Sequence, residues 1–375
     1  MTGSALQQVR RQRGMTQARA ITELIAVGRR RGIALPDSAS IKRRMSDWEN
    51  GKRYPDSQYR PLLRELYGRT DDELGFPEPG AAATDAHSDA MEEVAARLDN
   101  AAAVDGDLLL ALDQHTHRLR LLDRRLGAAT VLDQICAHIE TVRALMTNTV
   151  LSRDRAALAR ILADAAALAG WQALDTAAIT RAWQFFNIAR TCGQQAGESA
   201  VYAHALGEQS YALADLGRPD HALALLDEAH TLPRLPPLMR TWLTAACAEM
   251  HAATGAHREA LRGFDQADQL LPADHQDPSM PYLALSPAHL LRWRGHSLAM
   301  LGDSDALNYL IKALEDHDRS FVRAECGLRI DLATALKATG ELAESRAQAL
   351  TAKQLAVRIG SERNRRRVLP LTRPL

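Results

Sequence analysis

The chain has 375 residues, a length typical of two or three domains rather than one small module. Hydrophobic residues make up 46% and charged residues 25%, which excludes a disordered or fibrous chain. No stretch approaches the roughly 18 consecutive apolar residues of a membrane span, and residues 1–13 lack the apolar run of a secretory signal. The four cysteines lie at least 55 residues apart, so we expect no zinc site, no disulfide framework and a cytoplasmic location.

The formal net charge of zero hides an asymmetry along the chain. Residues 1–69 contain 15 Lys and Arg against 6 Asp and Glu, whereas residues 70–357 contain 25 against 39. Residues 358–375 are again basic, with 6 Arg against a single Glu. This distribution indicates that the N-terminal region meets a polyanion such as nucleic acid, while the acidic body limits non-specific attachment. An ordinary basic domain is the alternative.

Long alanine- and leucine-rich stretches with few β-branched runs predict an all-α fold. In the N-terminal region we expect four helices. Gly14 ends the first helix, and Thr16 caps the second. A basic loop is expected over 28–36, followed by a third helix that ends near Asn50. The fourth helix is expected over 57–67.

The third of these helices is amphipathic. Ile41, Met45 and Trp48 recur at helical spacing, which predicts that they face the core. The Lys-Arg-Arg triplet at 42–44 lies on the other side of the helix. The pattern therefore predicts a surface helix that presents positive charge to solvent.

Two separated motifs accompany these helices. R-x-R-G-M-T-Q at 11–17 and W-E-N-G-K-R-Y-P at 48–55 resemble the Cro/repressor-type, or XRE, helix-turn-helix family. In that family the first motif opens the second helix and the second motif closes the third. The resemblance covers residues 1–76 and implies a DNA-binding domain. The extra residues around 28–37 are similar to the lengthened variant of actinobacterial regulators.

The resemblance implies that the third helix is a recognition helix, whose N-terminal residues face base edges in the major groove. Arginine and lysine donate well to guanine, and further basic residues contact phosphates. The residues implied to contact DNA are Gln17, Ser40, Lys42, Arg43, Arg44, Lys52 and Arg53. A solvated basic face is the alternative for the triplet at 42–44. The nearby Asp47 could either accept a hydrogen bond from cytosine or repel phosphate.

Between the N-terminal domain and the rest of the chain, residues 77–90 are a linker by their proline and alanine content. Helical periodicity resumes over 91–156, which we interpret as a helical connector. Its leucines recur at helical spacing, at positions 108, 112, 119, 122 and 126. We expect this helix to pack on the helices that follow, and a dimerisation helix is the alternative.

Residues 157–357 contain a repeat. Five glycines each end a helical pattern, at spacings of 47, 38, 47 and 38 residues: Gly170, Gly217, Gly255, Gly302 and Gly340. Small residues let antiparallel helices approach closely, and glycine permits the tight turn between them. In the unit from 255 to 272, the Gly, Ala, Phe and Pro positions resemble the tetratricopeptide (TPR) pattern. This resemblance implies a TPR-like α-solenoid of stacked helix pairs.

A solenoid of this kind has a concave groove, which binds peptides in many TPR proteins. Regulators with a helix-turn-helix and TPR layout resemble receptors for short signalling peptides, which often read the peptide backbone with asparagine. Only Asn187 and Asn308 lie inside the repeats, so peptide, small-molecule and protein ligands all stay open. The candidate groove residues are Trp183, Phe186, Asn187, Arg190, Tyr202, Glu208, Gln209, Arg240, Trp242, His289, Arg292 and His296.

No motif in the sequence indicates an enzyme. The chain lacks a P-loop, a G-x-G-x-x-G after a strand, an H-E-x-x-H and a G-x-S-x-G, and its thirteen histidines are scattered. We therefore expect no catalytic residue, no cofactor and no metal. The basic tail at 358–375 is expected to be a solvated, disordered end, and a segment that contacts DNA or the acidic body is the alternative.

These patterns together predict a sequence-specific transcriptional regulator that binds double-stranded DNA as a homodimer. Its TPR-like domain is expected to sense a peptide or small molecule, to bind a protein partner, or to mediate oligomerisation. The alternative is a TPR-like interaction adaptor with a vestigial helix-turn-helix. No membrane partner is expected.

Overall fold

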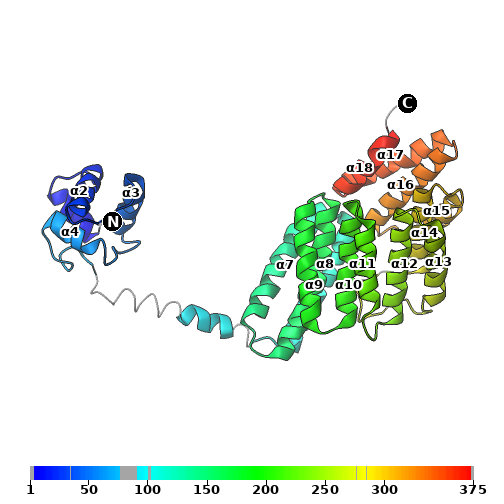
Figure 1. Cartoon of the computed structure of the whole chain (residues 1–375), viewed down its shortest axis with the longest axis horizontal. Helices are drawn as coiled ribbons and strands as arrows, with labels where there is room; N and C mark the ends of the chain where they lie inside the picture. The colour runs from blue at the N-terminus through cyan, green and yellow to red at the C-terminus, as the bar shows by residue number, and fades with distance from the viewer. Residues whose placement is uncertain are drawn as a thin grey trace. The chain divides into compact units, whose positions relative to one another are not determined.

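A computed structural model describes residues 4–33, 35–76, 91–99, 103–275, 277–283 and 285–372 (Figure 1). All regular secondary structure in these ranges is helical, so the predicted all-α class is confirmed for them. The chain folds into two compact units, Met1–Arg97 and Leu98–Leu375. The linker expected over 77–90 lies outside the described residues. Within the described ranges, no helix has both the length and the apolar character needed to cross a bilayer.

The first unit contains α1 (Ala5–Gln12), α2 (Gln17–Arg30), α3 (Ser38–Glu49) and α4 (Arg60–Tyr67), and a further short helix covers 91–99. The N-cap residues of α1, α2 and α3 are Ser4, Thr16 and Asp37. Each cap side chain accepts a hydrogen bond from the backbone N–H three residues further on, at 2.8–3.3 Å. These caps satisfy N–H groups that have no partner inside the helix, so they mark where each helix begins.

The core of the first unit lies between α2, α3 and α4. The inward face predicted for α3 is confirmed, because Ile41, Met45 and Trp48 are all buried. The Trp48 ring lies 5.0 Å from the Tyr59 ring, between ring centroids. Other fully buried side chains of this core are Leu6, Leu24, Leu62, Leu63, Tyr67 and Leu74.

The prediction of a basic loop over 28–36 is wrong at its start, because α2 continues through Gly28 and ends at Arg30. Leu35 folds back onto this turn so closely that a Cβ on Gly28 would lie 2.7 Å from the Leu35 Cδ1 atom. Just after the helix, Arg31 Nε donates to the Glu65 carboxylate of α4 at 2.6 Å. This hydrogen bond lowers the pKa of Glu65. The extra residues therefore lengthen a helix that is tied to α4.

The second unit is built from thirteen labelled helices among the described residues. In chain order they are α6 (Gly106–Leu126), α7 (Ala128–Asn148), α8 (Ser152–Asp175), α9 (Ile179–Ala196), α10 (Ser199–Asp215), α11 (Pro219–His230), α12 (Pro237–Ala253), α13 (His257–Leu270), α14 (Pro287–Leu301), α15 (Ala306–Glu315), α16 (Val322–Ala338), α17 (Leu342–Arg358) and α18 (Glu362–Thr372). Neighbouring helices pack in consecutive pairs, from α8 with α9 to α16 with α17. The pairs follow one another side by side (Figure 1).

Glycines make the turns inside four of these pairs. Gly217, Gly255, Gly302 and Gly340 have φ angles between +71° and +89°, a region that L side chains rarely adopt. Each follows the first helix of its pair, as the repeat spacing predicted.

The fifth glycine of the predicted series, Gly170, does not end a helix. It lies inside α8, which continues to Asp175, and the turn that follows is made by Ala177 at φ +61°. A Cβ on Gly170 would lie 2.6 Å from the Phe186 ring of α9. The glycine is therefore explained by the close approach of α8 and α9, and the predicted helix end is wrong.

The connector helix α6 packs against α7, α8 and α16. Of its periodic leucines, Leu112 and Leu119 are buried, whereas Leu122 and Leu126 are 41% and 46% exposed. Arg120 of α6 forms an ion pair with Asp164 of α8 at 2.5 Å. Only part of the predicted leucine face is therefore buried against the helix pairs.

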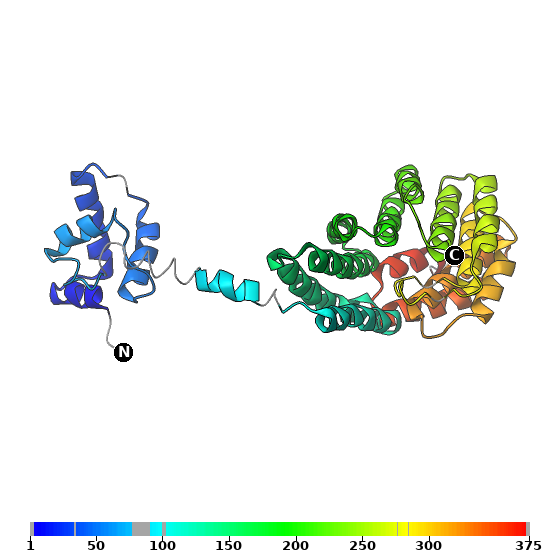
Figure 2. The ribbon, with the colours of Figure 1, turned by 90° about the horizontal axis from the view of Figure 1, so that it is seen from below.

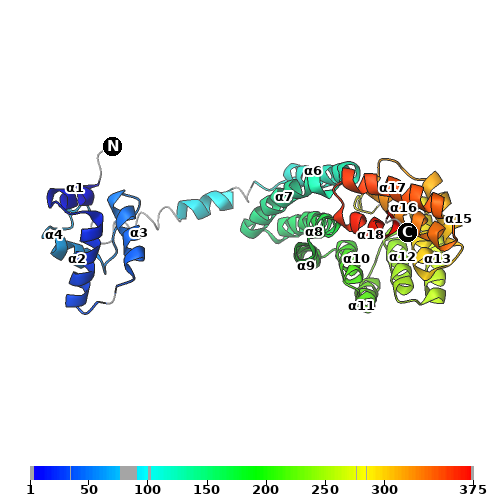
Figure 3. The same cartoon turned by 90° about the horizontal axis from the view of Figure 1, so that it is seen from above.

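The basic tail expected to be disordered is instead an ordered helix over its described part, and this prediction is wrong. The helix α18 packs against α8, α16 and α17 (Figure 3). Seen from below, it lies within the arc of the helix pairs (Figure 2). Arg363 donates two hydrogen bonds of 2.7 Å to Asp215, and Arg367 donates one of 2.6 Å to Asp331. The tail is ordered because its arginines meet carboxylates of the acidic body and Val368 is buried.

Candidate functional site

The first candidate site is an open hollow of about 630 Å³ beside α3. On α3 its lining residues are Ser40, Arg43, Arg44 and Asp47, whose spacing places them on one face of a helix. The segment after α3 supplies the rest of the lining. The full lining is Ser40, Arg43, Arg44, Asp47, Trp48, Lys52, Arg53, Tyr54 and Asp56. The hollow thus joins a helix face to the segment that follows it.

Five of the seven residues implied to contact DNA line this hollow: Ser40, Arg43, Arg44, Lys52 and Arg53. Lys42 is exposed on α3 but does not line it. Gln17 is placed elsewhere, because its side-chain amide donates to Glu49 at 3.3 Å. The structure therefore gathers most of the predicted set in one place and gives Gln17 a partner within the chain.

The basic side chains of the hollow differ in their partners. Among the described residues, Arg43, Lys52 and Arg53 have no carboxylate within 4.0 Å. Arg44 lies 3.9 Å from Asp56 and stacks 5.4 Å from the Tyr59 ring centroid. All four are exposed to solvent. The hollow therefore presents three cations that no carboxylate of the described chain neutralises.

Glu49, at the end of α3, has a structural role. Arg10 of α1 holds its carboxylate with two hydrogen bonds, of 2.5 and 2.9 Å, and both side chains are buried. The Glu49 hydrogen bond raises the pKa of Arg10. Arg10 also donates to the Met15 carbonyl at 2.7 Å, in the turn before α2. The pair joins α1, that turn and the end of α3, so it fixes how α3 is presented.

Tyr54 lines the hollow although no sequence pattern predicted it there. Its side chain is 51% exposed, an uncommon situation for a large aromatic residue. Its position between Arg53 and Pro55 is the only signal that the sequence offers. Asp47 and Asp56 place negative charge in the same hollow.

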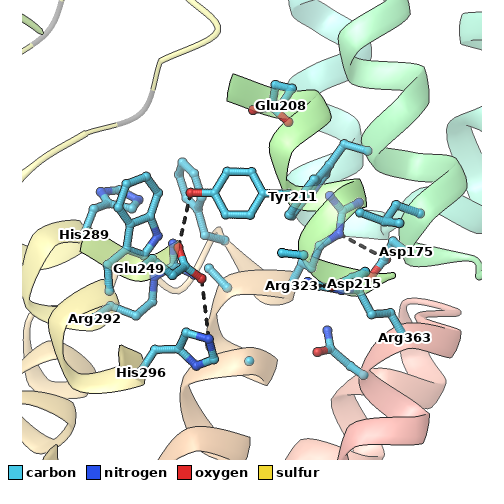
Figure 4. Close-up of a pocket in the computed structure, with 18 of the residues that line it drawn as sticks. Asp175, Glu208, Tyr211, Asp215, Glu249, His289, Arg292, His296, Arg323 and Arg363 are labelled. Carbon is cyan, nitrogen blue, oxygen red and sulfur yellow. Dashed lines mark hydrogen bonds and ion pairs between the residues drawn. The ribbon is translucent and has the colours of Figure 1, made fainter. Parts of the chain in front are cut away.

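The second candidate site is a pocket of about 680 Å³ in the second unit (Figure 4). Most of its lining comes from the first helix of each pair, namely α8, α10, α12, α14 and α16. The connector helix α6 and the C-terminal helix α18 supply most of the remaining helical wall. Because the tail forms α18, part of this wall comes from the chain's own C-terminal helix, a point that the sequence left open.

Ion pairs hold the wall of this pocket together. Arg323 of α16 pairs with Asp123 of α6, and its Nε lies 3.1 Å from Asp175 of α8. Burial alone would lower the pKa of Arg323, but these two carboxylates raise it. The hydroxyl of Ser361 donates to Asp175 at 2.6 Å, which extends the cluster towards α18. Helices from the two ends of the second unit are thereby tied to each other across the pocket.

A second cluster surrounds Glu249 of α12. The Tyr211 hydroxyl donates to Glu249 at 3.2 Å, and His296 Nε2 lies 3.5 Å from the same carboxylate (Figure 4). His296 Nδ1 lies 2.9 Å from Asp331, which also pairs with Arg367. Burial alone would raise the pKa of Asp331, but His296 and Arg367 lower it to about 2. These carboxylates are therefore already occupied by partners within the chain.

Aromatic side chains make up much of the remaining wall. The ring of Tyr211 lies 5.7 Å from that of Trp171 and 6.5 Å from that of Trp293. His204 lies between Tyr282 and Trp242, with ring centroids 4.3 and 5.5 Å apart respectively. The pocket is thus lined by aromatic rings and by charged side chains that mostly pair with each other, a composition typical of small-molecule sites.

Of the twelve predicted groove residues, five line the pocket: Glu208, Trp242, His289, Arg292 and His296. The other seven do not: Trp183, Phe186, Asn187, Arg190, Tyr202, Gln209 and Arg240. Phe186 is fully buried in the core, so it cannot meet a ligand in a groove. Gln209 is also buried and donates to Asn187 at 2.9 Å.

Two others of these seven also have partners within the chain. The hydroxyl of Tyr202 donates to Glu228 at 2.6 Å and accepts from Gln194. Arg240 donates to the backbone carbonyl of Leu235 at 3.2 Å. Tyr202 therefore links neighbouring helices and Arg240 holds the turn before its own helix, which the helix register alone did not reveal.

The pocket residues that come from the two ends of the unit were not predicted from the sequence. Arg124, Arg323 and Arg363 lie on α6, α16 and α18, and none was assigned to the groove. The excess of basic residues in the tail was the only available signal for α18. Within the described residues, no group of three or more His, Cys, Asp or Glu side chains is placed to hold a metal ion.

Comparisons with known proteins add no assignment to either site. No known protein family matches the chain, and no curated protein is found as a relative.

Proposed function

We propose that this protein is a sequence-specific DNA-binding transcriptional regulator, with α3 as its recognition helix. The observation that carries the proposal is the hollow beside α3, where Arg43, Lys52 and Arg53 are exposed and have no carboxylate within 4.0 Å in the described chain. Unpaired cations on a helix and on the segment that follows it suit the charge of a DNA groove and its phosphates. Two sequence motifs at 11–17 and 48–55 support it through their resemblance to XRE-type regulators.

The residues of the hollow divide into two chemical roles under this proposal. Arg43, on the exposed face of α3, has the fork of donors that matches O6 and N7 of guanine. Lys52 and Arg53 follow the helix and are proposed to contact phosphates, which set affinity and its salt dependence. Arg44 is held nearer the protein by Asp56 and Tyr59, so we assign it a supporting contact.

The second unit is proposed to be a TPR-like sensor. The pocket among its helix pairs gives a ligand access to α6, α8, α16 and α18 at once. A ligand that changes how these helices pack would change the geometry of a dimer, and with it the affinity for two half-sites. The proposed regulator acts in the cytoplasm as a homodimer on double-stranded DNA.

A second candidate function is a protein-interaction adaptor whose first unit no longer reads DNA. The observation in its favour is that Asp47 and Asp56 line the same hollow as the cations. Carboxylates there would repel phosphates, and they can accept hydrogen bonds from donors of a partner protein.

Selection from a random duplex library separates these two functions. The full chain is compared with the triple variant Lys42→Ala, Arg43→Ala, Arg44→Ala. The matched control is Arg19→Ala, Arg64→Ala, which removes exposed arginines that are outside the hollow and pair with carboxylates. We expect one enriched motif with the wild type and the control, and none with the triple variant. No enrichment by folded wild type would favour the adaptor. Equal enrichment by all three proteins would contradict the assignment of α3 as the recognition helix.

A further inference from the structure

The arginines of the second unit's pocket fall into two groups. Five have a carboxylate within 4.0 Å: Arg120, Arg323, Arg363, Arg366 and Arg367. Among the described residues, Arg124 and Arg292 line the same pocket and have no carboxylate within that distance. A guanidinium removed from bulk water is costly to leave without an anion, so these two positions stand out from their neighbours.

The two unpaired arginines are linked through shared neighbours. The Cζ atom of Arg124 lies 4.3 Å from the centroid of the Phe321 ring, and the His289 ring lies 5.7 Å from the same ring. Arg292 follows His289 by three residues, so both lie on one face of α14 (Figure 4). Burial, followed by the charges of Arg292 and Arg124, lowers the pKa of His289 to about 3. The imidazole is therefore neutral beside two cations.

Arg292 also has an unsatisfied donor. Its Nε is buried and has no hydrogen-bond partner among the described residues. The carboxylates whose charge reaches it are Glu249 and Asp331. Glu249 is engaged by Tyr211 and His296, and Asp331 is engaged by His296 and Arg367. Donors are thus present without a free acceptor, which is the arrangement that an incoming anion would complete.

The rest of the pocket restricts the size and the chemical class of such an anion. Trp171, Tyr211 and Trp293 form an aromatic wall in which the Tyr211 ring is tilted against both tryptophan rings, and Trp293 is the residue next to Arg292. A volume of about 680 Å³ is within the range of sites for small organic molecules. The paired arginines leave no second free cation cluster among the described lining residues, so one acidic group is expected.

We propose that the pocket binds a small organic acid with an aromatic body, whose acidic group is held by Arg124 and Arg292. The aromatic body lies against Trp171, Tyr211 and Trp293. The inference rests on the proposed function only in making this acid the effector of the regulator. Binding itself is a property of the second unit and does not depend on DNA.

A pair of fluorescent dyes tests the proposal on the full chain. The anionic probe is 1-anilinonaphthalene-8-sulfonate, and the neutral probe is N-phenyl-1-naphthylamine, which has the same ring system without the sulfonate. We expect the anionic dye to bind the wild type at least about tenfold more tightly, since its charge meets two unpaired guanidinium groups. Equal affinity for the two dyes, or no binding of the anionic dye, would overturn the proposal.

Variants assign the preference to the two arginines. Arg124→Gln with Arg292→Gln is expected to remove the preference and leave binding of the neutral dye unchanged, which also reports an intact pocket. Arg124→Lys with Arg292→Lys keeps both charges and is expected to retain the preference in part. The matched control is Arg366→Gln, which changes a pocket arginine that pairs with Glu362 and should have no effect. Equal losses in the Gln, Lys and control variants would overturn the assignment.

Competition then distinguishes the acidic groups. Indole-3-acetate supplies a carboxylate, phenyl phosphate supplies a phosphate, and tryptophol is the neutral control. Displacement of the anionic dye by either acid, but not by tryptophol, supports the proposal and identifies the preferred group. Displacement by tryptophol as good as that by both acids would contradict it. Because no DNA is present, a failure of DNA recognition in the library selection leaves these results unaffected.

Discussion

The hollow beside α3 and the pocket of the helix pairs are both rich in arginine, but their arginines have different partners. In the pocket, Arg323 lies between Asp123 and Asp175 with its side chain 14% exposed, and these ion pairs join three helices. In the hollow, Arg43 is exposed and has no carboxylate within 4.0 Å in the described chain. Pairing with carboxylates, rather than arginine content, therefore decides which arginines are available to a ligand. Variants that remove paired charges and variants that remove unpaired charges therefore test this difference.

The largest expected effect is on a buried pair of the first unit. Glu49→Ala leaves Arg10 buried without its carboxylate, so we expect a loss of about 3–5 kcal/mol in the free energy of unfolding of this unit. Hydrogen-exchange mass spectrometry of peptides from α1 to α3 measures that unit separately. The matched control is Glu23→Ala, which breaks an exposed pair with Arg19 and should cost at most about 1 kcal/mol. Similar costs for the two variants would contradict the structural role of Glu49.

The next largest effect is on the free energy of unfolding that a paired carboxylate of the pocket contributes, and this contribution depends on pH. The pKa of Asp331 is about 2 in the folded protein, below its usual value of 3.8. A lowered pKa stabilises the fold above pH 3.8, and this stabilisation is lost as the pH falls through 2. Its full size is about 2 kcal/mol. Urea unfolding of the wild type and Asp331→Asn should therefore differ at about pH 6 and converge towards about pH 2.

The exposed Asp220 provides the control for that experiment. Asp220→Asn should leave the free energy of unfolding close to that of the wild type at every pH. A difference between wild type and Asp331→Asn that stays constant over the whole pH range would mean that the pairing of Asp331 is not what stabilises the fold.

The smallest effect is on the unpaired charges of the hollow. Lys52→Ala with Arg53→Ala removes no contact that the structure shows, so thermal unfolding should be unchanged. If both side chains contact phosphates, the slope of log affinity against log salt should become shallower by about 2. Fluorescence anisotropy with a labelled duplex at several salt concentrations measures this slope. An unchanged slope would place the phosphate contacts elsewhere on the first unit.

Local signals predicted the parts of the fold that depend on local chemistry. Thr16 begins α2 as a cap, and Ile41, Met45 and Trp48 face the core as their spacing indicated. Gly255 makes its turn at a positive φ angle. Each of these features is decided by residues within about one helical turn, so a single sequence contains the necessary information.

The predictions that failed depend on distant residues. Gly170 faces Phe186 on the next helix. A glycine that allows two helices to approach closely looks the same in the sequence as a glycine that ends a helix, and only the packing separates the two. The tail helix α18 is ordered by Asp215, which is 148 residues earlier in the chain than its partner Arg363. The pocket likewise includes the pair of Arg323 and Asp123, which are 200 residues apart. Spacing along the sequence does not encode such contacts.

The most direct test of the central claim, that α3 reads DNA sequence, is a binding titration with the selected duplex and with single-base substitutions of it. We predict that Arg43→Ala lowers affinity for the selected duplex by about 1–3 kcal/mol and removes the preference at one guanine while preferences at other positions persist. A uniform loss of affinity for every duplex, with all base preferences intact, would contradict the claim and reduce Arg43 to a contact with the phosphate backbone.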